Sequence, residues 1–189
     1  MIDDLNIIVQ RDPSNALGVA GDEWKQATFQ AEIISPDHDN REIKNIIIAG
    51  MGGSALAALI AKKWLQSEIS QSLEIIRDYH LPKSVNKNTL VIASSYSGNT
   101  EETVSALYEA LAQDAQIATI SAHGKLEEIA NRKDIAHVKL PSGLQPRMAV
   151  IYNLRALIKL LVAFDIVAPE KYDEIEQSAD FLREEIKNW

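Results

Sequence analysis

The chain has 189 residues, of which 46% are hydrophobic and 24% charged, and its formal net charge is −8. This length is enough for one well-buried core and a terminal extension. The absence of cysteine excludes disulfides, thiolate nucleophiles and cysteine-ligated metals, and the acidic balance excludes general nucleic-acid binding, which needs a basic stripe. A small phosphorylated ligand held by local donors is still compatible with this charge.

We expect a cytoplasmic protein with no membrane partner. The first 13 residues lack the basic region and long apolar run of a secretory signal. The most apolar stretch, residues 150–167, is interrupted by Arg155, Lys159 and Asp165.

The chain is expected to have three parts. Residues 1–40 are predicted to form a helical extension, and the core domain is predicted over residues 41–167, after a polar, turn-rich segment. Residues 168–189 are predicted to form a charged amphipathic helix. The extension carries an apolar stripe of Trp24, Phe29, Ile33 and Ile34.

Within the core domain, short apolar segments alternate with helical patterns. Strands are expected at residues 46–49, 73–79, 90–94, 116–121 and 135–140. Helices are expected at residues 54–66, 100–113, 125–132 and 147–164. This alternation favours a parallel sheet with right-handed crossovers, and such uniformly apolar strands are typical of sheets buried on both faces. We therefore predict an α/β fold, a three-layer α/β/α sandwich around a five-stranded parallel sheet, with ligands bound beyond the carboxyl ends of the strands.

The first predicted strand runs into the turn GMGGS, residues 50–54. This turn lacks the final glycine of a dinucleotide fingerprint and the Lys-Ser/Thr pair of a P-loop, which disfavours a nucleoside triphosphate. Gly52 and Gly53 would permit positive φ and close approach of a ligand to the backbone. Ser54 would cap the helix or donate to a ligand. Alone, the turn fits a plain capped connection equally well.

The third predicted strand runs into SSYSGNTEE, residues 94–102, which is more specific. Hydroxyls at Ser95, Ser97 and Thr100 surround a glycine at the start of a helix, where free N–H groups and the helix dipole attract an anion. Because capping needs only one hydroxyl, three favour an oxyanion cradle. Glu101 and Glu102 suit the first turn of a helix and are interpreted as helix starters rather than as bases.

The two turns together resemble the sugar isomerase (SIS) domain, and most closely the N-terminal half of the bifunctional phosphoglucose/phosphomannose isomerases. The segment RDYHLP at residues 77–82 and the Pro146-Arg147 pair before the last long helix extend the resemblance over about residues 40–165. The resemblance implies a flavodoxin-like SIS domain.

The resemblance also implies roles for the residues that match. Ser95, Ser97 and Thr100 would bind the phosphate of a sugar phosphate. Arg147 would lie near C1 and C2 of the sugar and stabilise the enediolate-like charge, which suits a permanently cationic fork of donors. The residues that would line the sugar side of the pocket are Gly52, Gly53 and Ser54.

An aldose–ketose isomerisation also needs a general base and a ring-opening acid. In the family these are a glutamate and a histidine of a second SIS domain, with the histidine reaching across a dimer, and this chain stops at Trp189, where that domain would begin. We therefore expect the chain to lack them and to hold half of an active site. His123 and His80 are weaker candidates for a base. His38 and His137 have no metal-ligand spacing, so we expect no metal and no cofactor.

The leading hypothesis is the sugar-phosphate-binding half of an isomerase that interconverts glucose 6-phosphate, and mannose 6-phosphate, with fructose 6-phosphate. Two alternatives stay open: a single-domain SIS isomerase such as a 6-phospho-3-hexuloisomerase, and a non-catalytic sugar-phosphate-sensing module. Under each reading the resemblance implies a homodimer, with the apolar final helices as candidates for the contact.

Overall fold

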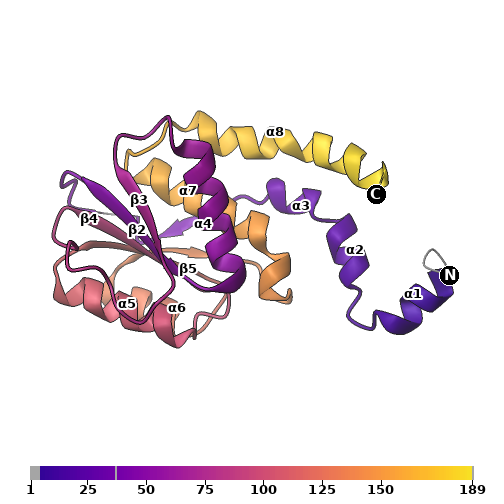
Figure 1. Ribbon diagram of the computed structural model, residues 1–189, viewed down its shortest axis with the longest axis horizontal. Helices are drawn as coiled ribbons and strands as arrows, with labels where there is room; N and C mark the ends of the chain where they lie inside the picture. The colour runs from indigo at the N-terminus through magenta and orange to yellow at the C-terminus, as the bar shows by residue number, and fades with distance from the viewer. Residues whose placement is uncertain (1–4, 37, 189) are drawn as a thin grey trace.

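The computed structural model describes residues 5–36 and 38–188, so parts of the two predicted terminal extensions (residues 1–4, 37 and 189) lie outside the described residues. One six-stranded sheet with the order β1-β6-β5-β4-β2-β3 forms the centre (Figure 1). Its strands are β1 (Ile33–Ile34), β2 (Asn45–Gly50), β3 (Ser72–Ile76), β4 (Thr89–Ser94), β5 (Gln116–Ser121) and β6 (Ala136–Lys139). Strands β2 to β6 run parallel to one another, in the order of a flavodoxin-like sheet.

The predicted α/β class and its five parallel strands are confirmed, and the strand count is corrected to six. Ile33 and Ile34, predicted as part of a helical stripe, form β1 and pair antiparallel with Val138 and His137 of β6. These β-branched residues fit the pleated edge that β6 would otherwise expose. Ser35 then leaves the strand with a φ of 51°.

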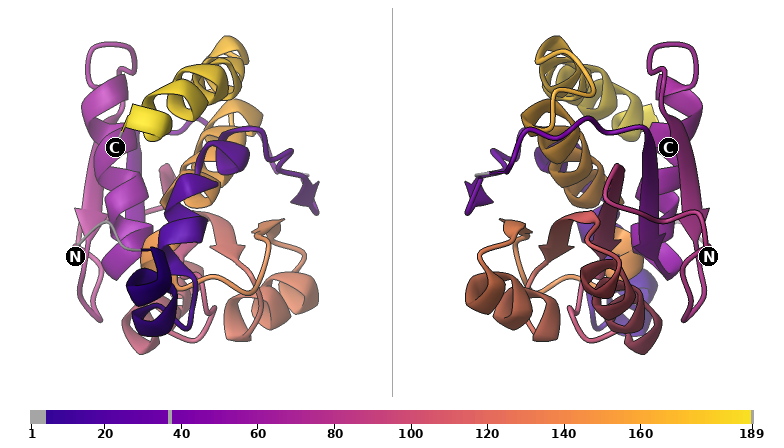
Figure 2. Two further views of the ribbon diagram at one scale, coloured as in Figure 1. Left: turned by 90° about the vertical axis from the view of Figure 1, so that its right-hand side faces the viewer. Right: turned by 90° about the vertical axis from the view of Figure 1, so that its left-hand side faces the viewer.

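Helices cover both faces of the sheet, as the apolar strands indicated. On one side lie α4 (Gly52–Leu65), α7 (Val150–Ala163) and α8 (Glu170–Glu185), and on the other lie α5 (Glu101–Ala112) and α6 (Lys125–Lys133). Figure 2 shows α8 outside α7, on the side of the molecule away from α5 and α6. Alternate residues of β2, β4 and β5 enter the two cores. None of the described helices has the length and apolar character needed to cross a membrane.

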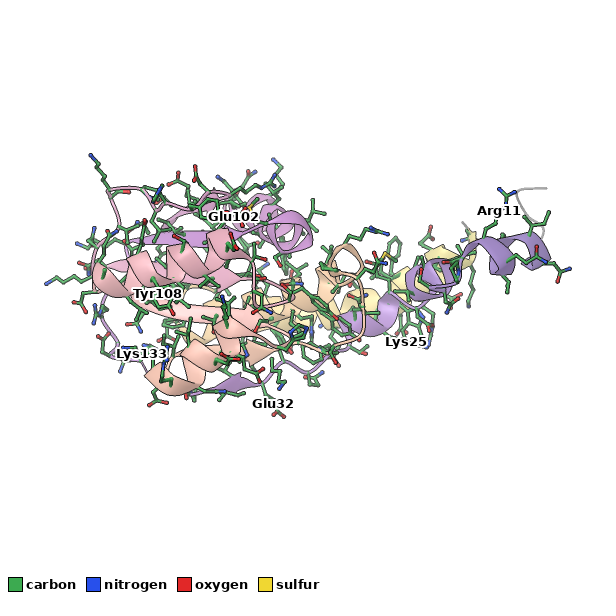
Figure 3. The ribbon with its side chains drawn as sticks, turned by 90° about the horizontal axis from the view of Figure 1, so that it is seen from below. Arg11, Lys25, Glu32, Glu102, Tyr108 and Lys133 are labelled. Atoms are coloured by element: carbon green, nitrogen blue, oxygen red, sulfur yellow. The ribbon has the colours of Figure 1, made fainter. Side chains whose placement is uncertain are left out.

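The described residues before the sheet form an N-terminal arm of three short helices, α1 (Leu5–Arg11), α2 (Ala16–Gly21) and α3 (Trp24–Ala27). The arm projects from the body of the molecule, with Arg11 towards its tip and Lys25 towards its root (Figure 3). The root is not peripheral, because α3 packs against α7 and α8 and the side chain of Ala27 is fully buried.

A buried arginine ties the root of the arm to the core. Arg155 of α7 has no exposed surface, and its guanidinium carbon lies 3.7 Å from the centroid of the Tyr172 ring on α8. Its Nε donates to the Phe29 carbonyl at 2.8 Å, and its Nη1 donates to the Tyr172 carbonyl at 2.9 Å. Its Nη2 lies 3.3 Å from a carboxylate oxygen of Glu176. These partners compensate the cost of burying the charge and join three segments.

Replacing this arginine should loosen the arm and α8 together. We expect Arg155→Met to lower the free energy of unfolding by at least about 2 kcal/mol, because two hydrogen bonds from a charged donor are lost, at about 1.5–3 kcal/mol each. The Phe29 carbonyl keeps the Tyr172 hydroxyl as a second donor at 3.0 Å, so the loss should stay near the lower end. Urea unfolding measures the change. Lys159→Met is the matched control. It removes a cation of the same helix that also lies over the Tyr172 ring, 5.0 Å from its centroid, but makes no hydrogen bond within the described residues. Equal stability of the two variants would contradict the anchoring role.

A buried histidine makes stability depend on pH. His137 of β6 is fully buried, and its Nδ1 lies 2.8 Å from Thr119 Oγ1, while its Nε2 has no hydrogen-bond partner among the described residues. Burial lowers the pKa of His137 below its usual 6.5. The unfolded chain therefore binds this proton more readily, and the stabilisation present at neutral pH is lost as the pH falls below about 6.5.

We accordingly expect the free energy of unfolding in urea to fall between pH 7.5 and pH 5.5, and to fall less in His137→Gln. His123→Gln, which changes an exposed histidine, should keep the wild-type dependence. The assignment fails if His137→Gln and the wild type respond identically to acidification.

Candidate functional site

The carboxyl ends of β2, β4 and β5 meet at one edge of the sheet, because these strands are parallel neighbours. The turn after β2 leads into α4 at Gly52, whose φ is 51°. At Gly53 space is the constraint: an added Cβ would lie 2.3 Å from the Pro146 carbonyl oxygen and 3.2 Å from Arg147 Cα. Ser54 follows with only 4% of its surface exposed. Of the three predicted residues of this turn, Gly53 thus lies directly against the turn that carries Arg147. Ser54 does not cap the helix as expected, because α4 begins at Gly52 with Met51 at the cap position.

The turn after β4 brings its three predicted hydroxyls together. Ser95 Oγ lies 2.7 Å from Thr100 Oγ1 and 3.4 Å from Ser97 Oγ. Ser95 is buried, whereas Ser97 and Thr100 are half-buried. Thr100 immediately precedes α5, whose first N–H groups have no partner within the helix. Hydroxyls and free amides at a helix start form a donor set suited to an oxyanion.

The loop between β5 and α6 clamps this hydroxyl turn. Gly98 has a φ of 67°, and an added Cβ would lie 1.7 Å from the His123 carbonyl oxygen. The Leu126 amide donates to the Gly98 carbonyl at 3.0 Å, and the Lys125 amide donates to Asn99 Oδ1 at 3.1 Å. His123 thus meets the turn through its backbone, while its side chain is exposed.

Tyr96 joins the hydroxyl turn to the segment that leads to Arg147. Its ring is 5% exposed, its hydroxyl donates to the Pro141 carbonyl at 2.8 Å, and it accepts from the Leu144 amide at 3.0 Å. Sequence reasoning passed over Tyr96 and Asn99. The only signal was that both interrupt a run of small residues within the turn.

Arg147 does not begin the last long helix as predicted. It lies in the separate 3₁₀ turn η1 (Pro146–Met148), and α7 begins two residues after that turn, at Val150. The Arg147 side chain is exposed, and within the described part of the chain its guanidinium has no hydrogen-bond or ion-pair partner. A cleft of about 260 Å³ lies between η1 and the arm. Its lining includes Ser14, Val19, Leu144, Gln145, Arg147 and Met148.

The candidate bases are otherwise engaged or exposed. The hydrogen bond from His80 Nδ1 to Glu109, at 2.7 Å, raises the pKa of His80, and Glu109 also accepts from the Leu81 amide. Glu101 and Glu102 occupy the first turn of α5, and Figure 3 shows Glu102 on this helix. The Tyr79 hydroxyl lies 3.4 Å from Glu101. No cluster of three or more metal-ligating side chains occurs among the residues that the structure describes.

The backbone contact at Gly98 supplies a test of this arrangement. Gly98→Ala should lower the free energy of unfolding by clearly more than Gly52→Ala. Both alanines would bear the left-handed φ, at about 1–2 kcal/mol, but only the Cβ at position 98 would collide with a backbone carbonyl. Urea unfolding of the two variants separates the collision from the φ cost. Equal losses would show that the two loops are not in contact.

The sequence pattern of the SIS domain matches residues 41–162. The bifunctional phosphoglucose/phosphomannose isomerase of Caldicellulosiruptor bescii is 40% identical over 149 residues, which are 79% of this chain and 44% of that protein. The enzyme of the same name from Thermoplasma acidophilum is 39% identical over 144 residues, 76% of this chain and 42% of that protein. The D-glucosamine-6-phosphate 4-epimerase of Sulfolobus acidocaldarius is 31% identical over 140 residues, which are 73% of this chain and 44% of that protein. The chain thus spans less than half the length of these relatives.

Solved structures share the fold at low sequence identity. Tagatose-6-phosphate ketose/aldose isomerase from Escherichia coli superposes with a TM-score of 0.57 and 18% identity, over 89% of this chain and 47% of that one. The sugar isomerase domain of an RpiR transcription factor from Sphaerobacter thermophilus superposes with a TM-score of 0.57 and 16% identity. The match covers 89% of this chain and 97% of that one. These two likenesses concern the fold alone.

Proposed function

The chain belongs to the SIS domain family, and on that premise we propose that it is the sugar-phosphate-binding half of an aldose–ketose isomerase. Its substrates in this proposal are glucose 6-phosphate and mannose 6-phosphate, each interconverted with fructose 6-phosphate. The observation that carries the proposal is the convergence of Ser95, Ser97 and Thr100 at the start of α5. Sequence identity of 40% to a relative named phosphoglucose/phosphomannose isomerase supports the choice of reaction.

In this proposal the hydroxyl turn binds the phosphate. The side chains of Ser95, Ser97 and Thr100 and the first amides of α5 donate to its oxygens, and the helix dipole adds partial positive charge. The carboxylate of Glu101, the first residue of α5, accepts a hydrogen bond from the Tyr79 hydroxyl at 3.4 Å.

The sugar would lie between the two helix starts. Gly52, Gly53 and Ser54 line its far side, and the free guanidinium of Arg147 stabilises the negative charge that develops on oxygen when the C2 proton leaves. We assign the general base and the ring-opening acid to a second SIS domain, because the named isomerases are more than twice as long as the matched segment. No cofactor takes part in the proposed reaction.

Binding is tested by thermal unfolding with and without fructose 6-phosphate, alongside an isomerase assay on the same sample. A ligand that binds only the folded state must raise the melting temperature, by the equivalent of about 2.7 kcal/mol at 100 times its Kd. Thr100→Val keeps the shape of the side chain but loses a hydroxyl that would bind a charged group, so we expect about tenfold weaker binding or more. Ser84→Ala, in an exposed loop, is the control.

The outcomes of this experiment distinguish the proposed half-enzyme from the alternative functions. A shift without turnover supports a phosphate cradle that lacks its base, in a half-enzyme or in a sensing module. Turnover would place the base in this chain, as in a single-domain isomerase, and would direct mutagenesis to His123, Glu101 and Glu102. No shift at saturating ligand, or an equal shift in Thr100→Val, would overturn the cradle.

We also propose a homodimer, but through a different surface from the one the sequence suggested. The apolar stripe of α7 is core, with Leu157 2% and Leu161 0% exposed. On α4, by contrast, Leu56, Leu59 and Ile60 are 47%, 42% and 46% exposed. Their i, i+3, i+4 spacing places them on one face of the helix, and a second copy of the chain would bury that face by an isologous contact.

If α4 makes this contact, Ile60→Asp should sediment as a monomer at concentrations where the wild type is a dimer, because an unpaired carboxylate would be buried. Sedimentation velocity measures the state. Lys62→Asp introduces the same group on an exposed position of the same helix and should remain dimeric. A monomeric wild type, or a dimeric Ile60→Asp, would rule out this interface.

A further inference from the structure

The side chain of Gln26 makes two hydrogen bonds to backbone groups far along the chain. The proposed reaction does not explain these two bonds. Gln26 belongs to α3 of the arm and is 3% exposed. Its Nε2 donates to the Met148 carbonyl at 2.6 Å, and its Oε1 accepts from the Tyr152 amide at 3.2 Å. The partners lie 122 and 126 residues further along the chain. The carboxamide of Gln26 thus acts as both donor and acceptor at the start of α7.

These two partners are the ones that a continuous helix would join to each other. In an α-helix the amide of residue i bonds to the carbonyl of residue i−4, which here would pair Tyr152 with Met148. Instead the Gln26 carboxamide stands between them and satisfies both groups. The first helical bond of α7 is the next one along, from the Asn153 amide to the Ala149 carbonyl at 3.0 Å. Gln26 is thus inserted where the helix would extend backwards.

The segment before this insertion, η1, follows a 3₁₀ path. Before Ala149 the chain forms 3₁₀ bonds, from the Met148 amide to the Gln145 carbonyl and from the Ala149 amide to the Pro146 carbonyl. On its other side this turn touches Gly53, which leaves no room for a Cβ. The turn that carries Arg147 is therefore held from two sides, by α4 and by the arm.

We propose that Gln26 is a positioning residue for Arg147: by occupying the missing helical hydrogen bond, it keeps η1 out of α7 and so places the guanidinium at the edge of the site. The inference rests on the role proposed above for Arg147. It gives the arm a part in the site, although α3 lies outside the residues 41–162 that match the SIS pattern. Without the carboxamide, Tyr152 and Met148 bond to each other and α7 extends through Arg147.

The test is a double-mutant cycle with Gln26→Ala and Arg147→Gln in the full chain, with affinities for fructose 6-phosphate and for inorganic phosphate measured by calorimetry. We expect Gln26→Ala to weaken fructose 6-phosphate binding about fivefold or more and to leave phosphate binding unchanged. In the Arg147→Gln background it should cause no further loss. Independent, multiplying losses, or an unaltered affinity in Gln26→Ala, would overturn the proposal, since a merely structural role would weaken both ligands in both backgrounds.

A ligand-free measurement separates this inference from the proposed function. The NMR backbone shifts of residues 147–149 should become α-helical in Gln26→Ala, and unchanged shifts would overturn the insertion even if the sugar phosphate binds. If the wild type binds no fructose 6-phosphate, the proposed function fails, and with it the role of Gln26 in the site. Gln30→Ala, an exposed glutamine of the segment after α3, is the matched control. Gln26→Glu keeps the size of the side chain and one acceptor, should Gln26→Ala fail to fold.

Discussion

Direct backbone contact between loops is the constraint on which the carboxyl edge of this sheet depends. The Gly98 backbone touches the His123 carbonyl, and the Gly53 backbone touches the Pro146 carbonyl. In both places even a methyl group would collide with main-chain atoms, which cannot rotate away as a side chain can. These contacts bring the starts of α4 and α5, the β5–α6 loop and η1 to one edge of the sheet. A small ligand could then meet donors from several crossovers at once.

The parts of the molecule that could be predicted are those in which neighbouring residues carry the signal. The apolar strand at residues 90–94 and the hydroxyl turn behind it are contiguous, so their type and order could be read directly. β1 could not be predicted in this way, because two isoleucines become a strand only when the edge of β6 is beside them. The break before α7 was missed for a similar reason. Val150 and the residues before it are compatible with helix, and a glutamine more than 120 positions away interrupts it.

In the candidate site, too, the features carried by neighbouring residues could be predicted, and those that depend on distant partners could not. The hydroxyls of Ser95, Ser97 and Thr100 could be predicted because a group of three exceeds what a helix cap requires. Tyr96 and Asn99 could not be predicted, because Tyr96 donates to the Pro141 carbonyl and Asn99 accepts from the amide at the start of α6. No spacing in the sequence marks such backbone partners. The geometry of the three hydroxyls supplies the donors that the proposed phosphate site needs.

The arm is held mainly through main-chain atoms, and this has a consequence for sequence variation. Arg155 grips the carbonyls of Phe29 and Tyr172, and Gln26 grips a carbonyl and an amide at the start of α7. A carbonyl is the same whichever side chain its residue bears. The side chains at Phe29 and Met148 therefore matter less to these bonds than the path of the chain. Tyr172 is different, because its ring packs on the Arg155 guanidinium and its hydroxyl donates to the Phe29 carbonyl. A different arm grafted onto this domain would have to keep the same backbone path and Gln26, whereas most of its exposed residues could be changed.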